Sequence, residues 1–529
     1  MIKLFSLFSL SKIEKKAFVY IFVATLFTMS SLLIANILYS DDLTRVTTGE
    51  TFWNDNGRPL STLVSIILQL GQPLTDISPL PQLLAFAIYA LSAVFLGKLF
   101  QVHNLLLLTL CGIVFVLNPF NLQNFAFVFD SFPMALAILA SVLAALSISF
   151  ATETSSSKQE KIIIFVLGSL FILCSLCLYQ AATSVYLVSC FFYGLIQLLD
   201  REIKRSLIIF CTTILALFVA LIAYVPIKNY YIINSYNVLH SQVVSFSEAP
   251  QKAVSNLVSF WRTIQILLGS NNIIINLIVI ILIATVILAL IKIINSSRIA
   301  FYQKKSQLQP LLFVTCLLLY GLLLVVSPLG MMLILENPIF APRTMMGFSA
   351  LVTICCLFLS NEIIYYKSQK VFKYCLTAFF SLIILAFANV SFTLGNVLYT
   401  QNIQDEIIVT VLISDLGEIV PQLPISLQHP TLAVVNSLEY TYGNTKAYSK
   451  YPLLKDITWF YLRTNSIHFY TKLETLGFRF TRPHYEKHVF TSPDKQFVPT
   501  NKPVVTRPLY NIYFENNDLL VVVLQNPIN

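Results

Sequence analysis

Long apolar runs dominate the first three quarters of the chain, and short polar segments separate them. A helix needs about 20 apolar residues to cross the hydrocarbon core of a bilayer. The first run is too long for the apolar part of a signal peptide and lacks a small-residue cleavage site, so we expect it to be retained. The pattern predicts eleven transmembrane helices, at about residues 17–38, 81–100, 104–118, 133–150, 162–178, 182–199, 206–226, 273–293, 310–327, 345–361 and 374–396.

Two shorter apolar segments have the pattern of surface helices. Pro59 begins a run to Leu70 that would be roughly 18 Å long as a helix, which is too short to cross a bilayer. Residues 250–268 carry apolar side chains at helical spacing, opposite Lys252 and Arg262. We expect both segments to lie along the membrane surface.

The composition becomes that of an ordinary soluble protein after Gln401. A helix is expected at 405–420, and short β-rich runs follow at 432–435, 478–481 and 519–524. The predicted fold is therefore a polytopic α-helical membrane protein with about eleven transmembrane helices in residues 1–396. Residues 397–529 are expected to form a soluble α/β domain.

Composition and charge support a membrane protein. Hydrophobic residues make up 57% of the chain and charged residues only 11%, which excludes one large soluble core. The net charge of +9 could suggest a nucleic-acid partner, but the lysines and arginines concentrate in alternate short loops. That distribution indicates the orientation of the chain in the membrane: it predicts a cytoplasmic N-terminus and an extracytoplasmic C-terminal domain. A nucleic-acid partner is therefore not expected.

Three aspartates are the first candidates for chemistry. Asp41 and Asp42 follow the first apolar run, where the end of a helix disfavours negative charge by about 0.3–1 kcal/mol, so a function is one reason for their presence. Acids at the membrane surface could activate a hydroxyl; alternatively, they only mark the exit of the helix. Asp130 is the single charged residue between Lys98 and Glu153. It is either a functional group near the membrane or the N-cap of the next helix.

Cations in other outer loops are candidates for binding an anion. Arg343 and Glu336 are the only charges in a proline-rich loop, and a guanidinium at the start of a helix suits a phosphate. Arg343 could equally be an interface anchor. Lys228 and His240 share a long outer loop and could touch an anionic ligand.

The interiors of the apolar runs contain almost no ionisable residues. A proton- or sodium-coupled transporter needs such groups near the middle of the membrane, so the pattern favours chemistry at the surface. Tyr179 and Gln180, between two predicted spans, fit interface residues. His484 and His488 lack the spacing of a zinc protease site, and no cluster of metal ligands is evident.

Taken together, the outer segments resemble the glucosyltransferase II family, the serotype-converting membrane enzymes that decorate bacterial O-antigen. The resemblance recurs in order over residues 39–345, continues weakly to Gln401 and does not extend beyond about residue 425. The matching segments are YSDD at 39–42, NDNGRPL at 54–60, GQPLTDISPLPQ at 71–82, NPF at 118–120, FDSFPMAL at 129–136, LCLYQ at 176–180 and NPIFAPR at 337–343.

The resemblance implies a membrane glycosyltransferase of the GT-C type. Such an enzyme would move a sugar, expected to be glucose, from a polyprenyl-phosphate carrier to O-antigen of lipopolysaccharide or to another lipid-linked or polymeric glycan. The reaction would take place outside the bacterial cytoplasmic (inner) membrane. The carrier would contribute a leaving group of low pKa, so that one carboxylate base and cations for the phosphate suffice.

The same resemblance assigns roles to the candidate residues. Asp41 or Asp42 would be the base, and Asp130 would orient the sugar or share that role. The donor phosphate would be bound by Arg343, Arg58 and Arg45. Contacts to the substrates are expected from Asn54, Asp55, Tyr179, Gln180, Glu336, His240 and Lys228. No metal or other cofactor is required, although a divalent metal stays open.

Two other classes of function stay open at this point. One is a transporter or flippase of lipid-linked glycan whose outer domain binds the cargo. The other is a different transferase of surface polysaccharide, such as a polymerase or an acyltransferase. The predicted surface helices at 59–70 and 250–268 would either admit the polyprenyl chain from the bilayer or only cover the protein.

Overall fold

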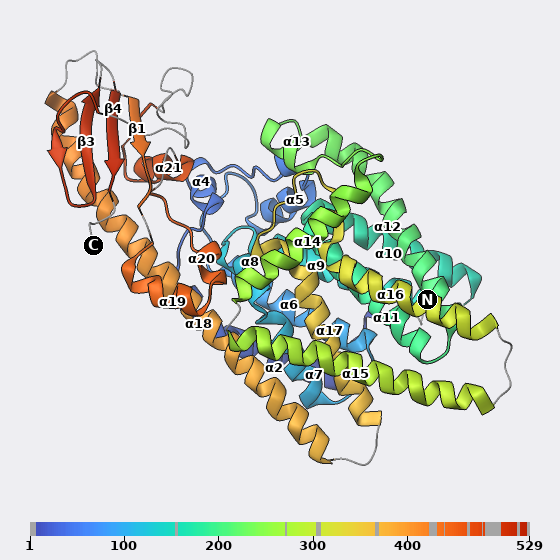
Figure 1. Cartoon of the computed structure of the whole chain (residues 1–529). Coiled ribbons are helices and arrows are strands. Elements are labelled where there is room, and N and C mark those ends of the chain that lie inside the picture. The colour runs from blue at the N-terminus through green and yellow to red at the C-terminus, as the bar shows by residue number, and fades with distance from the viewer. Residues whose placement is uncertain are drawn as a thin grey trace.

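The computed structural model is a helical bundle with a small sheet at one end (Figure 1). It describes residues 7–153, 157–269, 272–302, 308–365, 370–422, 431–438, 440–462, 466–478, 480–481, 499–515 and 519–525. The helices of the first half are α2 Lys12–Thr28, α3 Ser30–Ala35, α4 Asp41–Thr48, α5 Pro59–Leu68, α6 Leu80–Leu99, α7 Leu105–Val116, α8 Leu122–Ala126, α9 Ser131–Ala151, α10 Lys158–Leu178, α11 Thr183–Leu199 and α12 Ile203–Tyr231. The remaining ones are α13 Ser235–Ser241, α14 Ala249–Leu268, α15 Ile273–Tyr302, α16 Leu308–Val326, α17 Met346–Tyr365, α18 Lys370–Ile419, α19 Thr445–Lys450, α20 Leu453–Ile457 and α21 Ile467–Thr475.

Short 3-10 turns connect several of these helices. They are η1 Asn54–Asn56, η2 Pro119–Asn121, η3 Gln180–Ala182, η4 Ser327–Ile334, η5 Pro342–Thr344, η6 Val420–Gln422 and η8 Tyr442–Asn444. Proline stands in the first turn of η2, η4 and η5, where its missing N–H costs nothing and its fixed φ suits a helix start.

Eight helices in the described part of the chain are long and apolar enough to cross a membrane. A ninth span results if α7 and the following η2–α8 segment, which meet at 51°, are counted as one broken helix. Each of the eleven predicted segments contains a helix, but the first is divided between α2, of 17 residues, and α3, so the predicted count of eleven crossings stays a prediction.

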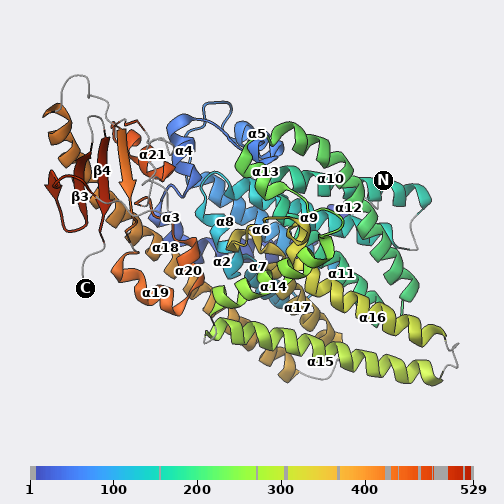
Figure 2. The same ribbon diagram turned by 45° about the horizontal axis from the view of Figure 1, so that its top comes forward.

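Burial divides the long helices into central and peripheral ones. The apolar windows of α9 and α11 are 78% and 89% buried within the protein, whereas those of α15 and α16 are only 22% buried. Because exposed apolar surface of this extent is unfavourable in water, the peripheral helices have the character of a lipid-facing surface. The bundle is thus built around α9 and α11, with α15 and α16 at one side (Figure 2).

The first apolar run does not form the single helix that was predicted for residues 17–38. Helix α2 ends at Thr28, α3 ends at Ala35, and Asn36 and Ser40 adopt positive φ angles of 41° and 53°. These residues redirect the chain, and α4 then begins at Asp41. The acidic pair therefore lies at the N-terminal end of a helix, where the dipole favours carboxylates, and the prediction that it lies at a C-terminal end is wrong.

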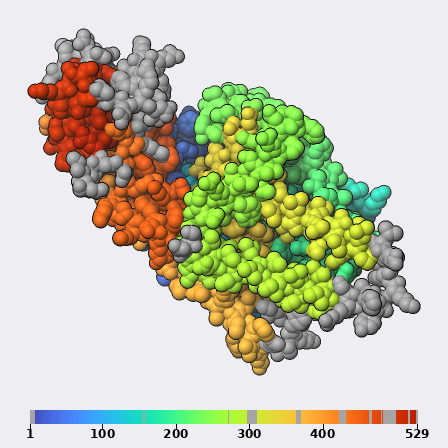
Figure 3. Space-filling model, in the orientation of Figure 1, coloured from blue at the N-terminus to red at the C-terminus, as the bar shows by residue number. Residues whose placement is uncertain are grey.

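Helix α18 extends through the expected boundary at residue 397. Separate helices were predicted at 374–396 and 405–420, but Lys370–Ile419 is one helix of 50 residues. Its first part packs with the bundle, and its last part packs against the C-terminal sheet through Ile408, Val409, Leu412 and Leu416. Figure 3 shows the resulting C-terminal unit, in orange and red, projecting from one end of the bundle.

The C-terminal sheet has the strand order β1-β4-β3-β2. Its strands are β1 Thr431–Val435, β2 Val505–Thr506, β3 Tyr510–Glu515 and β4 Leu519–Leu524. Strand β1 is parallel to β4, and the other pairs are antiparallel. The predicted strands at 432–435 and 519–524 are confirmed, whereas in the predicted run 478–481 the described residues contribute only a bridge from Thr481 to Thr431.

The chain between the sheet strands returns to the bundle. Tyr448, Tyr451, Leu453, Leu454 and Ile457, on and beside α19 and α20, belong to the same hydrophobic core as the long helices. This return brings residues after 440 against the segment that carries the acidic pair.

Candidate active site

The two adjacent aspartates have different environments. The Asp41 side chain is 60% exposed, whereas Asp42 is fully buried. Neighbouring residues of a helix point about 100° apart, so the two carboxylates face different surroundings. The sequence alone left the two acids equivalent, and the structure separates them into an accessible carboxylate and a buried one.

Asp42 connects α4 to the loop before α9. Its carboxylate accepts hydrogen bonds from the backbone N–H groups of Val128 at 2.7 Å, Phe129 at 3.1 Å and Tyr39 at 3.3 Å. Burial raises the pKa of Asp42 to about 8, although Arg45 and the backbone donors favour its charged form. Asp42 is thus placed to fix the backbone of this site.

Asp130 is buried in a second set of contacts. It accepts a hydrogen bond from Trp53 Nε1 at 2.7 Å and pairs with Arg45 Nη1 at 2.6 Å. Asp130 does occupy the N-cap position of α9, as the alternative prediction had it, but its side chain makes no capping bond and is engaged by Arg45 and Trp53 instead. No pattern in the sequence pointed to Trp53. It is completely buried, and the Arg45 guanidinium lies over its ring, 4.3 Å from the ring centroid.

The environment of Arg45 does not favour its predicted contact with a donor phosphate. Arg45 is only 2% exposed, and its guanidinium is engaged by Asp130 and by the carbonyl of Thr51 at 3.3 Å. A guanidinium whose charge is already paired inside the protein has few donors left for a ligand. Arg45 instead holds Asp130 and α4 together.

The guanidinium of Arg343, unlike that of Arg45, is not held in an ion pair by any residue that the structure describes. Its backbone N–H donates to Gln123 Oε1 at 3.0 Å, and its guanidinium lies 5.6 Å from the centroid of the Phe127 ring. Within the described residues, no carboxylate lies within 4.0 Å of this guanidinium. Burial lowers the pKa of Arg343, but Tyr179, Tyr39, Asp41 and Asp130 outweigh burial and raise it. Arg343 is therefore a charged group close to Asp41 without a direct ion pair.

Arg58 lies in an adjoining network that includes two predicted substrate contacts. Its guanidinium stacks 4.5 Å from the Tyr179 ring centroid, and its Nε donates to Gln180 Oε1 at 3.1 Å. The Gln180 amide also donates to the Asn56 carbonyl and to the Tyr224 hydroxyl. Gln180 thus fixes the turn before α5, and Tyr179 links this turn to Arg343, whose carbonyl lies 3.4 Å from its hydroxyl.

The other predicted substrate contacts lie on η1, on α12 and α13, and in the loop after η4. Asn54 accepts a hydrogen bond from Thr62, and exposed Asp55 accepts one from Asn237 of α13 through its carbonyl. Lys228, His240 and Glu336 gather where α12, α13 and the loop after η4 meet. They make contacts with the backbone: Lys228 donates to the Ser241 carbonyl, His240 Nδ1 lies 2.8 Å from the Asn337 carbonyl, and the Glu336 N–H donates to the Gln242 carbonyl.

Two residues that sequence reasoning missed join the parts of the site. The Tyr39 hydroxyl donates to the carbonyl of Ile457 at 2.5 Å and accepts from Gln123 Nε2 at 3.1 Å. Burial raises the pKa of Tyr39 to about 12, so the phenol keeps its proton. Tyr39 is the first residue of the matched segment at 39–42, and Gln123 follows the one at 118–120, but the sequence pattern does not indicate a contact with residue 457.

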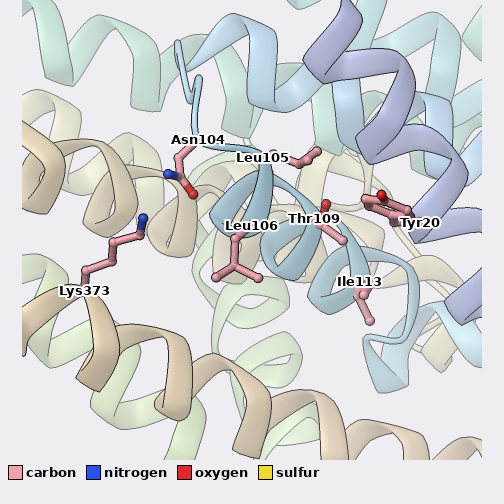
Figure 4. Close-up of a pocket in the computed structure, with 7 residues that line it drawn as sticks. All are labelled: Tyr20, Asn104, Leu105, Leu106, Thr109, Ile113 and Lys373. Atoms are coloured by element: carbon pink, nitrogen blue, oxygen red, sulfur yellow. The ribbon is translucent and has the colours of Figure 1, made fainter. Parts of the chain in front are cut away.

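The described residues hold no group of three or more histidine, cysteine, aspartate or glutamate side chains that could bind a metal ion. A cavity of about 520 Å³ lies elsewhere, between α2, α7 and α18 (Figure 4). Tyr20, Thr109 and Lys373 line it, together with apolar residues and Asn104, and it contains none of the candidate acids. It is separate from the site around Asp41.

Residues 30–354 match the model of a family described as glucosyl transferase GtrII. The chain is also 26% identical, over 346 residues, to an uncharacterized 55.3 kDa protein from the gtrB 5′ region of Salmonella phage P22. That match covers 64% of this chain and 67% of the phage protein. No solved structure matches the chain.

Proposed function

The chain belongs to the GtrII glucosyl transferase family, and on this premise we propose that it transfers glucose from a polyprenyl-phosphate carrier to a surface glycan. The acceptor is O-antigen or a related polysaccharide, and the reaction takes place at the outer side of the bacterial cytoplasmic membrane. The matched residues contain all the acids, arginines and other polar residues predicted for the site from the sequence. The proposal adds the donor, the acceptor and the side of the membrane to the family assignment.

The observation that carries the proposal is that one site contains both an accessible carboxylate, Asp41, and a guanidinium without a carboxylate partner, Arg343, within the described residues. Asp41 is 60% exposed, and Arg343 has no direct carboxylate partner in the described part of the chain. Transfer from a sugar phosphate needs a base for the acceptor and a cation for the leaving group. These two residues meet both needs.

In the proposed step, the acceptor hydroxyl loses its proton to Asp41 and its oxygen forms a bond to C1 of glucose. The bond between C1 and the phosphate oxygen breaks, and the electron pair leaves with polyprenyl phosphate. Arg343 stabilises the negative charge that develops there, with Arg58 as a second cation. Asp42, Asp130 and Arg45 hold the backbone and side chains around the reaction.

The surface helices suit a lipid carrier. Helix α5 exposes Leu63 and Ile67, and the following Leu70 is 95% exposed. The same helix is joined to the site, because Ser61 donates to the carbonyl of Leu178, next to Tyr179. We propose that the polyprenyl chain lies against α5 and reaches the phosphate site from the bilayer.

The test is transfer of radiolabelled glucose from synthetic polyprenyl-phosphate-glucose to a host glycan in membranes. The wild type should move label, and Asp41→Asn should lower the rate by about 100-fold or more, as expected for loss of a general base. Glu202→Gln, the same chemical change at an exposed residue at the start of α12, is the matched control and should keep full activity. Absence of transfer by the wild type would refute the proposed donor, and full activity of Asp41→Asn would refute the proposed base.

A further inference from the structure

The C-terminal unit packs onto the segment that presents Asp41. The Tyr461 hydroxyl donates to the Leu38 carbonyl at 2.6 Å, and the Tyr39 hydroxyl donates to the Ile457 carbonyl at 2.5 Å. Helix α21 lies beside α4 in both views of the ribbon (Figures 1 and 2). These two hydrogen bonds, at Leu38 and Tyr39, thus tie the C-terminal unit to the chain just before Ser40 and Asp41.

One histidine of the C-terminal unit faces the proposed base. His468 Nε2, on α21, lies 3.9 Å from Asp41 Oδ1. The His468 side chain is only 10% exposed, and the Trp459 ring packs edge-on against it with centroids 5.0 Å apart. Trp459 in turn lies 6.4 Å from the Tyr39 ring. The imidazole is therefore fixed, whereas the carboxylate beside it is open to solvent.

The backbone before Asp41 is strained. Ser40 has φ 53° and ψ −115°, a region that residues with a side chain rarely adopt. Such strain costs about 1–3 kcal/mol and persists only where the surroundings impose it. The contacts that hold this segment are those of Leu38 and Tyr39 with the C-terminal unit and those of the Asp42 carboxylate with the N–H groups of Tyr39, Val128 and Phe129. The docking is therefore one of the contacts that set the direction in which α4 starts.

We propose that the C-terminal unit completes the transferase site and that His468 is a positioning residue for Asp41. The imidazole N–H engages Oδ1, and Oδ2 is left to receive the proton of the acceptor hydroxyl. The separation of 3.9 Å closes to a hydrogen bond when the acceptor is bound, as catalytic contacts commonly tighten in the substrate complex. This inference rests on the proposed function, because it gives His468 a role in that same transfer.

The test compares His468→Ala and His468→Gln in the full-length protein, with synthetic polyprenyl-phosphate-glucose as the donor. His468→Ala should lower kcat by roughly 10- to 100-fold, because a misplaced base loses orientation, and the donor KM should stay within about twofold. His468→Gln keeps an N–H donor and should recover most of kcat. His103→Ala changes an exposed histidine just before α7 and should behave as the wild type.

The outcomes distinguish failure of this inference from failure of the proposed function. Wild-type kcat in His468→Ala, with Asp41→Asn inactive, would overturn the positioning role and leave the transferase assignment intact. Equal losses in the Ala and Gln variants, accompanied by a lower thermal midpoint, would show a structural role only and also overturn it. An inactive wild type would remove the proposed function and this inference with it.

Discussion

Replacing Asp42 with alanine tests whether Asp42 stabilises the fold while Asp41 acts as the base. Asp42 is fully buried, and its carboxylate is the acceptor for three backbone N–H groups. Asp42→Ala leaves these donors without their partner in a site that excludes water. Asp41→Ala removes a side chain that is 60% exposed and accepts no backbone N–H bond in the described structure.

The magnitude follows from the hydrogen bonds that are lost. The bonds from Val128 and Phe129, at 2.7 and 3.1 Å, have good lengths, and the one from Tyr39 at 3.3 Å is weak. A buried donor without a partner costs about 1–3 kcal/mol, so two such donors cost about 2–6 kcal/mol. An exposed substitution usually changes stability by no more than about 0.5 kcal/mol.

The assay is the thermal unfolding midpoint of the purified protein in detergent, measured together with glucose transfer. Asp42→Ala should lower the midpoint by on the order of 5 °C, since 1 kcal/mol corresponds to about 2–4 °C in chains of 150–250 residues and to less in longer ones. Asp41→Ala should unfold as the wild type does but lack activity. A stable, active Asp42→Ala, or an unstable Asp41→Ala, would contradict this division of roles.

Three further substitutions test other contacts. Arg343→Lys should raise the donor KM about tenfold with little change in kcat, because an ammonium group cannot grip a phosphate bidentately; an unchanged KM would refute the phosphate role. Trp53→Phe should cost about 1–3 kcal/mol by removing the N–H bond to buried Asp130, and an unchanged thermal midpoint would speak against that bond. Gly395→Ala should cost about 1–3 kcal/mol, since a Cβ on Gly395 would lie 2.4 Å from the Ser31 carbonyl carbon, and a wild-type midpoint would show that α3 and α18 are not packed so closely.

Long apolar helices were the most predictable part of the fold. Helices α6 and α9 begin and end within two residues of their predicted bounds, because a continuous apolar run leaves little choice. The change of direction after α3 was not predictable, since it depends on the backbone conformations of Asn36 and Ser40 and not on hydrophobicity. A run of apolar residues predicts that a segment is buried or lies in the membrane, but it does not predict where the chain turns.

The continuity of α18 shows a second limit. The composition becomes that of a soluble protein from Gln401, and a separate helix was predicted to begin at Asp405. In the structure they are buried: Gln401 donates to Asp405 at 3.0 Å and accepts from Thr441, and Asp405 accepts the N–H of Tyr461 at 3.0 Å. These polar side chains are docking contacts for the returning chain, which the linear pattern cannot distinguish from solvent exposure.

For the site, residue type was predictable and role was not. The acids and arginines of the matched segments do come together, but whether Arg45 or Arg343 is free depends on which one Asp130 pairs with. His468 could not be anticipated, because its approach to Asp41 depends on the docking of a unit more than 400 residues later in the chain.

Helix α18 acts as a mechanical strut. At 1.5 Å per residue its 50 residues span about 75 Å. Because the helix is continuous, its length and rotation fix the position of the sheet and α21 relative to the bundle. One residue inserted between the bundle part and the sheet part would rotate the distal end by about 100° and advance it by about 1.5 Å. Such an insertion would swing the C-terminal unit off α4 without changing any side chain of the site, so the length of this helix is itself a constraint on the chain.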